Sequence, residues 1–248
     1  SFKQKTAYEI PKRDWSSDMC SSDLDPLTNG PGGNTDYYSS PDRKPDTDLY
    51  PVIEARGIAL DFEVDLVSSY SVLNITDLSV YSQLWDLGYA SPYSTNPNNP
   101  TLKLTQYIQS GGALFILGEN SAFQPRDNEI GQFIEVLGGG SDITEGNIDF
   151  NYSRTLTVKN EFLIENATSQ VTFARPGVFT NYGYGTPITT QGFPLTGDLH
   201  FPAVMWKTGS LTVAPIGSVI SILDLNFIFG VYQNLNFVDN IIASLNTL

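Results

Sequence analysis

One uninterrupted apolar run, Ala113–Leu117, limits the fold more than any other segment of the chain. A strand that is apolar at every position is buried on both faces, as in the centre of a parallel sheet. Before it, Thr101–Ser110 carries apolar side chains at helical spacing and ends in a Gly-Gly pair, and Asp127–Leu137 after it is also helical. The order helix, strand, helix predicts an α/β domain with right-handed crossovers.

Further elements extend this pattern along the chain. Two more helices are expected, at Leu49–Gly57, where Gly57 is the expected C-terminal stop, and at Asn236–Leu248. Further strands are expected at Ala59–Val67, in the second half of Leu78–Leu87, and at Ser218–Leu223. Shorter strands with turn-rich joins are expected at Thr155–Val158, Val171–Ala174 and Leu211–Ala214. The expected fold is a mostly parallel, doubly wound sheet flanked by helices, with β-rich additions in the second half.

The first 24 residues differ in character from the rest. Lys3–Ile10 and Arg13–Leu24 each resemble one reading frame of the two oligonucleotides that flank a short-read sequencing insert, in matching order and spacing. The segment has neither apolar periodicity nor the apolar core of a signal peptide. We expect residues 1–24 to be a non-native, adapter-derived segment, the alternative being a polar native N-terminus. Residues 25–248 are then expected to form one N-terminally truncated α/β domain, beginning with a long polar loop over residues 25–48.

Charge and residue usage exclude several functional classes. The formal net charge is −14, and the first 24 residues carry four basic and four acidic side chains, so all of it lies in the remainder. An acidic surface repels nucleic acids and anionic membranes, and no apolar run reaches the roughly 18 residues of a membrane helix. The single cysteine, Cys20, lies in the first segment, which excludes thiol catalysis from the remainder. One histidine and no further cysteine disfavour zinc, so no metal and no cofactor is expected.

Residue usage also bears on location. Lysine is scarce, while asparagine, serine, threonine, tyrosine and glycine are abundant, a composition typical of exported bacterial proteins. An extracellular or periplasmic location is therefore expected, with the cytoplasm as the alternative.

Three local patterns carry a family resemblance. They are the central apolar strand running into Leu117–Ser121, the strand Ser218–Phe227 that contains Asp224, and the helix Asn236–Ile242 that begins with Asn-Phe. In this order and spacing they resemble the class I glutamine amidotransferase-like group, a flavodoxin-like α/β fold. Active members of that group carry a nucleophilic cysteine at the sharp turn after the central strand, paired with a histidine and a carboxylate. Such a turn projects the nucleophile above the sheet beside backbone N–H groups.

At the matching turn this chain has Glu119, or Asn120 or Ser121 if the alignment shifts, and no thiol. The resemblance therefore implies a scaffold without its amide-transfer chemistry. Glu119 and Asn120 could bind a ligand, because open α/β sheets place ligands at the carboxyl ends of their strands. The structural alternative, which we favour, is that these side chains cap N–H groups of the turn, with Ser121 capping a helical turn.

A hydrolase is the main catalytic alternative. Ser121 or Glu119 would act with His200, the only histidine, and Asp198 or Asp224 would orient that base. The turn lacks the Gly-x-Ser-x-Gly motif of hydrolase nucleophiles, and a lone histidine is more often a satisfied loop residue.

A binding role rests on aromatic residues. Tyr182 and Tyr184 lie in a glycine-rich segment and, with further aromatic residues, could form a surface for carbohydrate or for a protein partner. The further candidates are Tyr89, Tyr93, Phe193 and Trp206. The alternative is that these rings pack over the sheet. The sequence favours a non-catalytic ligand- or protein-binding domain, with the hydrolase as runner-up and a structural module of a longer chain as a third possibility.

Overall fold

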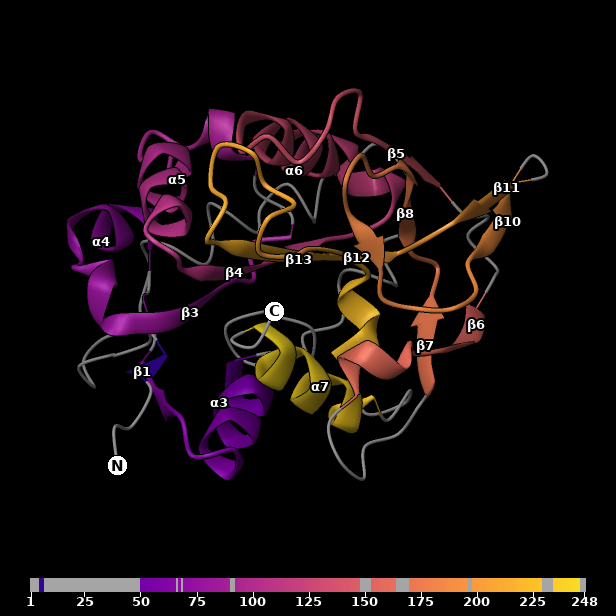
Figure 1. Ribbon diagram of the computed structural model, residues 1–248, viewed down its shortest axis with the longest axis horizontal. Coiled ribbons are helices and arrows are strands. Elements are labelled where there is room, and N and C mark those ends of the chain that lie inside the picture. The colour runs from indigo at the N-terminus through magenta and orange to yellow at the C-terminus, as the bar shows by residue number, and fades with distance from the viewer. Residues whose placement is uncertain are drawn as a thin grey trace.

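A seven-stranded mixed sheet forms the centre of the protein (Figure 1). The computed structural model describes residues 5–6, 50–65, 67, 69–89, 92–147, 153–163, 170–195, 198–228 and 234–245. In the order of the sheet, the strands are β2 (Glu63–Val64), β1 (Lys5–Thr6), β3 (Tyr81–Asp86), β4 (Ala113–Gly118), β13 (Ser218–Leu223), β12 (Ala203–Trp206) and β9 (Thr186–Pro187). The first five pair in parallel, whereas β12 is antiparallel to both of its neighbours.

Helices cover both faces of this sheet, as Figure 1 shows. They are α3 (Tyr50–Ala59), α4 (Tyr70–Ile75), α5 (Thr101–Gln109), α6 (Gln124–Val136) and α7 (Leu235–Leu245), joined by the 3₁₀ turns η3 (Leu78–Val80), η4 (Tyr93–Thr95), η5 (Ser121–Phe123), η6 (Asn160–Phe162) and η7 (Leu225–Ile228). Successive side chains of β4 point to opposite faces. Phe115 joins the core that contains residues of α3 and α7, and Leu114 joins the core that contains residues of α5 and α6. The expected α/β fold is thereby confirmed.

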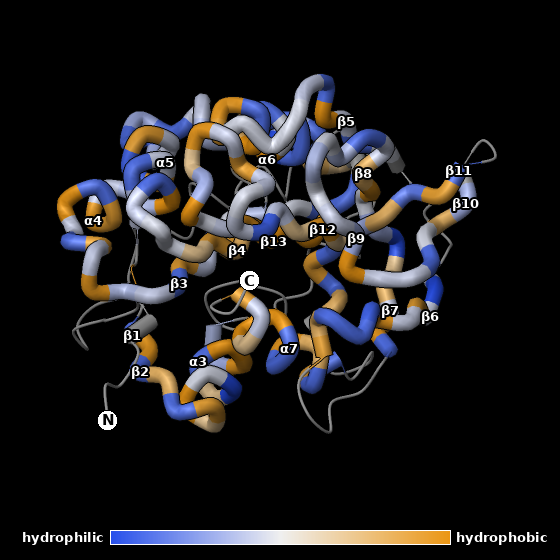
Figure 2. Tube along the Cα trace, in the orientation of Figure 1, coloured by the Kyte–Doolittle hydropathy of each residue, from blue (hydrophilic) through white to orange (hydrophobic). Residues whose placement is uncertain are grey.

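In the helix α7, apolar side chains at helical spacing produce one buried face. Hydrophobic and hydrophilic residues alternate along it, as the orange and blue segments of Figure 2 show. Phe237, Ile241 and Leu245 recur at helical spacing and are all buried.

The second half adds small antiparallel sheets, as expected. They pair β5 (Thr144–Asn147) with β8 (Gly177–Asn181), β6 (Ser153–Thr157) with β7 (Gln170–Ala174), and β10 (Phe193–Leu195) with β11 (Asp198–His200). The expected strand at Leu211–Ala214 is wrong, because this segment forms no strand and its residues 212–214 bend. Its backbone N–H groups of Thr212 and Val213 donate to Gly138 and Leu137 at the end of α6, and so are not available to a sheet.

Two further expectations need correction. Gly57 does not end α3 but lies inside it, where the absence of a Cβ leaves room for Val64. The strand expected over Ala59–Val67 shortens to Glu63–Val64, because the helix continues to Ala59 and a turn with positive φ at Asp61 follows it.

The first 24 residues also contain a strand that their composition does not predict. Lys5–Thr6 lies between β2 and β3 and pairs in parallel with both. Parallel pairing uses backbone groups, so polar side chains do not prevent it. The other residues of the expected adapter-derived segment, and the expected loop 25–48, lie outside the described residues.

One ion pair joins the two helices on the same face of the sheet. Arg56 of α3 donates from Nε to Asp239 Oδ1 of α7 at 2.6 Å, and from Nη2 to Oδ2. We expect Asp239→Asn to lower the free energy of unfolding by about 1–2 kcal/mol, because a charge-assisted, bidentate contact is lost. Urea unfolding at pH 7 measures this. The exposed Asp142→Asn, at a positive φ that asparagine tolerates, is the matched control. Equal losses in the two variants would contradict the prediction.

Candidate functional site

Three acidic residues stand at the carboxyl ends of three adjacent parallel strands. Asp86 ends β3, Glu119 follows β4, and Asp224 follows β13. The last residues of β4 and β13, Gly118 and Leu223, are paired in register, so Glu119 and Asp224 are neighbours across the sheet. Because open α/β sheets bind ligands at the carboxyl ends of their strands, this edge is the candidate site.

Glu119 is completely buried, and both of its carboxyl oxygens accept hydrogen bonds. Its Oε1 accepts a hydrogen bond from Asn120 Nδ2 at 2.8 Å, and its Oε2 accepts one from the backbone N–H of Leu225. Asn120 in turn accepts from the N–H of Ala122 at 3.0 Å, which caps the turn η5. These contacts match the structural alternative for Glu119 and Asn120. The side chain of Ser121 lies outside the described residues.

Asp224 is also completely buried, and the additional β-strands account for its burial. It accepts hydrogen bonds of 2.8 Å from the backbone N–H groups of Asn226 and of Ala174, the last residue of β7. At Gly177, which begins β8, a Cβ would collide with the carbonyl oxygen of Glu119. The β7–β8 segment therefore packs directly onto the carboxyl edge and covers it.

Burial changes the protonation of this edge. It raises the pKa of Glu119 well above its usual value, and the nearby Asp224 adds to the rise. Burial likewise raises the pKa of Asp127, which accepts a hydrogen bond of 3.1 Å from the N–H of Glu119. Glu145 has its pKa raised to about 8, mainly by burial. Glu145 therefore keeps its proton at neutral pH, and burial favours the protonated forms of Glu119 and Asp127.

A second buried cluster surrounds Asp86 and contains residues that sequence reasoning missed. Arg126 of α6 donates to Asp86 Oδ2 at 3.0 Å, and the hydroxyls of Tyr93 and Tyr70 donate to the same carboxylate at 2.7 and 3.0 Å. The guanidinium lies 4.2 Å from the centroid of the Tyr93 ring. Burial raises the pKa of Asp86, but the charge of Arg126 and the Tyr93 hydrogen bond outweigh it, so that the pKa falls below its usual value.

A local signal for part of this cluster exists in the sequence. Asp86 ends an apolar strand, and acidic residues at such positions often serve a site or a buried pair. Its partner Arg126 lies 40 residues further along the chain, and no local pattern connects the two.

The structure does not join His200 to the described side chains of the proposed catalytic set. His200 is buried in β11, and its Nδ1 has no hydrogen-bond partner among the described residues. Among the described residues, no hydrogen bond or ion pair joins His200 to Glu119 or Asp224, whose carboxyl groups bind other partners. Asp198, the other expected orienting group, is exposed at the start of β11. The hydrolase alternative with Glu119 as nucleophile therefore lacks its nucleophile-to-base contact.

The proposed aromatic surface is also reduced. Trp206 is completely buried, donates from Nε1 to the Gly139 carbonyl at 3.2 Å and packs against Phe179, so it is not available to a ligand. Tyr89, Tyr93 and Phe193 are buried as well. Tyr182 is half-buried against Phe201, and Tyr184 is 63% exposed. Of the six expected rings, only Tyr184 is extensively exposed.

Among the described residues, no group of three or more histidine, cysteine, aspartate or glutamate side chains could hold a metal ion. None of the helices in the described part of the chain is long and apolar enough to cross a membrane.

Comparison with known proteins finds relatives by structure only. No family model and no curated protein matches the chain. The N-terminal domain of mmIFT52 superposes with a TM-score of 0.54 at 14% identity, over 78% of this chain and 89% of that one. A ThuA-like protein from Bacteroides uniformis superposes with a TM-score of 0.52 at 14% identity, over 97% and 89% of the two chains. The chain shares their fold.

A third similar structure is the exo-beta-1,4-mannosidase Op5Man5 from Opitutaceae bacterium strain TAV5. The TM-score is 0.52 at 10% identity, over 99% of this chain but only 36% of the mannosidase. These superpositions establish the α/β fold. Because the sequence identities are only 10–14%, they carry no information about function.

Proposed function

We propose that this chain is a non-catalytic binding domain on a doubly wound, class I glutamine amidotransferase-like scaffold. Three observations support the scaffold. The parallel strands follow the order β2-β1-β3-β4-β13, which is the 2-1-3-4-5 order of flavodoxin-like sheets. Helices lie on both faces of the sheet (Figure 1). The ThuA-like protein superposes over nearly the whole chain.

The observation that carries the non-catalytic role is the state of Glu119. The family resemblance matches it to the turn at which active members carry their nucleophile, with Asn120 or Ser121 as the alternatives, yet Glu119 is completely buried and both of its carboxyl oxygens accept hydrogen bonds. A nucleophile needs a base within hydrogen-bond reach and an open position for the reacting atom. The covering strands remove the open position, and the contacts of Glu119 stabilise the turn instead.

The binding role and the location are further parts of the proposal. A domain without chemistry acts by holding a ligand or another protein, and the low lysine content and the single cysteine fit an exported bacterial protein. The acidic surface favours neutral or basic partners over nucleic acids.

Turnover assays test the non-catalytic role. The purified chain is incubated with L-glutamine, with ammonia as the readout, and with p-nitrophenyl acetate, with nitrophenolate as the readout. We expect rates equal to those of buffer, and no change in Glu119→Gln or His200→Ala. The hydrolase alternative predicts instead a turnover that falls at least about 100-fold in His200→Ala, the usual scale for loss of a general base. That result would overturn the proposal.

A further inference from the structure

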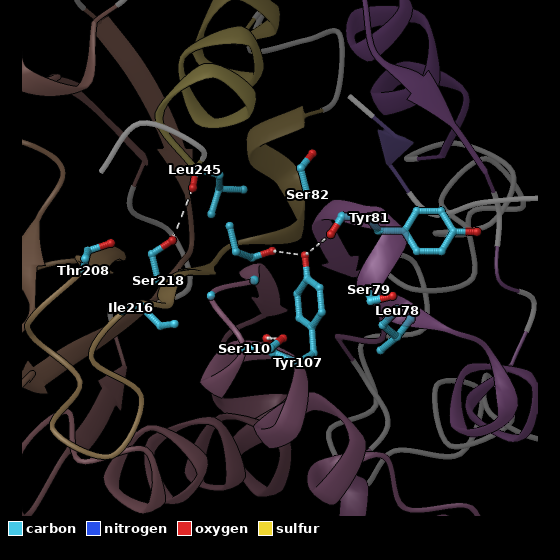
Figure 3. Close-up of a pocket in the computed structure, with 13 residues that line it drawn as sticks. Leu78, Ser79, Tyr81, Ser82, Tyr107, Ser110, Thr208, Ile216, Ser218 and Leu245 are labelled. Carbon is cyan, nitrogen blue, oxygen red and sulfur yellow. Dashed lines mark hydrogen bonds between the residues drawn. The ribbon is translucent and has the colours of Figure 1, made fainter. Parts of the chain in front are cut away.

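A hollow of about 350 Å³ opens at the amino edge of the central sheet, opposite the edge that carries Glu119 (Figure 3). It lies where three parallel strands begin, because its lining includes Tyr81, Ala113 and Ser218, the first residues of β3, β4 and β13. The end of α5 and the last turn of α7 complete its wall. Its volume falls in the range of small-molecule sites.

The lining is rich in hydroxyl groups and has no charge. Hydroxyls come from seven side chains, namely Ser79, Tyr81, Ser82, Tyr107, Ser110, Thr208 and Ser218. No lysine, arginine, aspartate, glutamate or histidine lines the hollow, although the chain has a net charge of −14. A ligand here meets polar groups without a counter-charge, which disfavours both cations and anions.

Three of these seven hydroxyls donate to carbonyl oxygens of the backbone. Ser110 donates from Oγ to the Tyr107 carbonyl at 2.7 Å, and Ser218 donates from Oγ to the Leu245 carbonyl at 3.3 Å. The Tyr107 hydroxyl donates to the carbonyl of Tyr81 at 3.2 Å (Figure 3). Because a hydroxyl has one hydrogen and two lone pairs, each of these oxygens keeps acceptor capacity. A complementary ligand therefore supplies several donors.

We propose that the amino-edge hollow binds a small neutral saccharide. A saccharide ring carries several uncharged hydroxyl donors on one side and C–H groups on the other. The hydroxyl oxygens of the lining would accept hydrogen bonds from the sugar hydroxyls, and the exposed side chain of Ile216 would contact the C–H groups. This site deepens the binding role proposed above and rests on it.

Saturation-transfer NMR on the intact chain tests the site. The probes are methyl α-D-glucopyranoside, methyl α-D-mannopyranoside and maltose, with ethylammonium and acetate as charged comparisons. Ser110→Leu fills the hollow from an exposed position at the end of α5, and Gln109→Leu adds the same group to a neighbouring exposed residue that does not line it. We expect a saccharide signal in the unmodified chain and in Gln109→Leu, and an affinity at least about tenfold lower in Ser110→Leu.

Each outcome decides the proposal. Thr208→Leu, at a second exposed lining residue, gives the same expected loss and serves if Ser110→Leu does not fold. No saccharide signal, equal binding in Ser110→Leu and Gln109→Leu, or stronger binding of ethylammonium or acetate would overturn the site. The non-catalytic role stands in those cases, because the turnover assays test it separately. Cleavage of maltose would contradict the non-catalytic role even if the hollow binds it.

Discussion

Replacing Arg126 with leucine is expected to lower the free energy of unfolding by about 3–5 kcal/mol, the usual cost of breaking a buried ion pair from one side. Arg126 is completely buried and forms the ion pair with Asp86 at 3.0 Å. Without the guanidinium, the buried Asp86 carboxylate keeps, among the described residues, only the hydroxyls of Tyr70 and Tyr93 and the N–H of Gly88 as partners. Urea or guanidinium unfolding at pH 7, followed by circular dichroism, measures the loss.

A double-mutant cycle separates the pair from the packing of the arginine stem. The double variant Asp86→Asn/Arg126→Leu removes both charges. We expect its loss of unfolding free energy to be smaller than the sum of the two single losses by at least about 1 kcal/mol. Arg154→Leu, at a half-buried arginine whose Nη1 donates to the Gly192 carbonyl, is the comparison for losing an arginine without a buried carboxylate partner. Strictly additive losses would show that the two charges do not stabilise each other.

The second large effect is a stability that falls as the pH rises from about 4.5 to about 8. The unfolded chain releases the Glu145 proton near pH 4.5, whereas the folded protein holds it until about pH 8. Between these values the unfolded state binds fewer protons, so Glu145 alone contributes a loss of up to about 1.4 kcal/mol per pH unit. Glu119 and Asp127 act in the same direction because burial raises their pKa.

Asp86 has the opposite dependence but in a different window. Its pKa is lowered in the folded protein, so its contribution is lost only below the usual value of 3.8. We therefore expect the greatest stability near pH 4, where Asp86 is ionised in the folded protein. Above this pH the unfolded chain releases the proton of Asp127, whose usual pKa is 3.8, and then those of Glu119 and Glu145, whose usual pKa is 4.5, while burial favours their retention in the folded protein.

Urea unfolding at pH 4.5, 6.0 and 7.5 measures this profile. Glu145→Gln removes one titrating group, so we expect a shallower decline than in the unmodified chain. Glu161→Gln, at an exposed glutamate that pairs with Lys207, is the matched control and is expected to leave the slope unchanged. Stability that rises between pH 5 and pH 8, or an identical slope in Glu145→Gln, would refute the assignment of a raised pKa to Glu145.

The sequence by itself determined the elements whose signal is local. The all-apolar runs of β4 and β13 indicate buried strands, and the helical stripes of α5, α6 and α7 indicate helices packed on them, because hydrophobic periodicity is a property of consecutive residues. The strand Ala203–Trp206 gives a much weaker signal, because four apolar residues fit a buried strand or a buried helical turn equally well. Its two antiparallel pairings decide the matter.

The candidate site shows the same division. The sequence located the turn at Glu119 and Asn120, because a polar group directly follows an apolar strand. Only the tertiary structure decided that Glu119 is closed off by Leu225, 106 residues away, and that Asp86 meets Arg126, 40 residues away. Burial and charge pairing depend on which segments, far apart in the sequence, come into contact in the fold. The pattern of neighbouring residues does not indicate these long-range contacts.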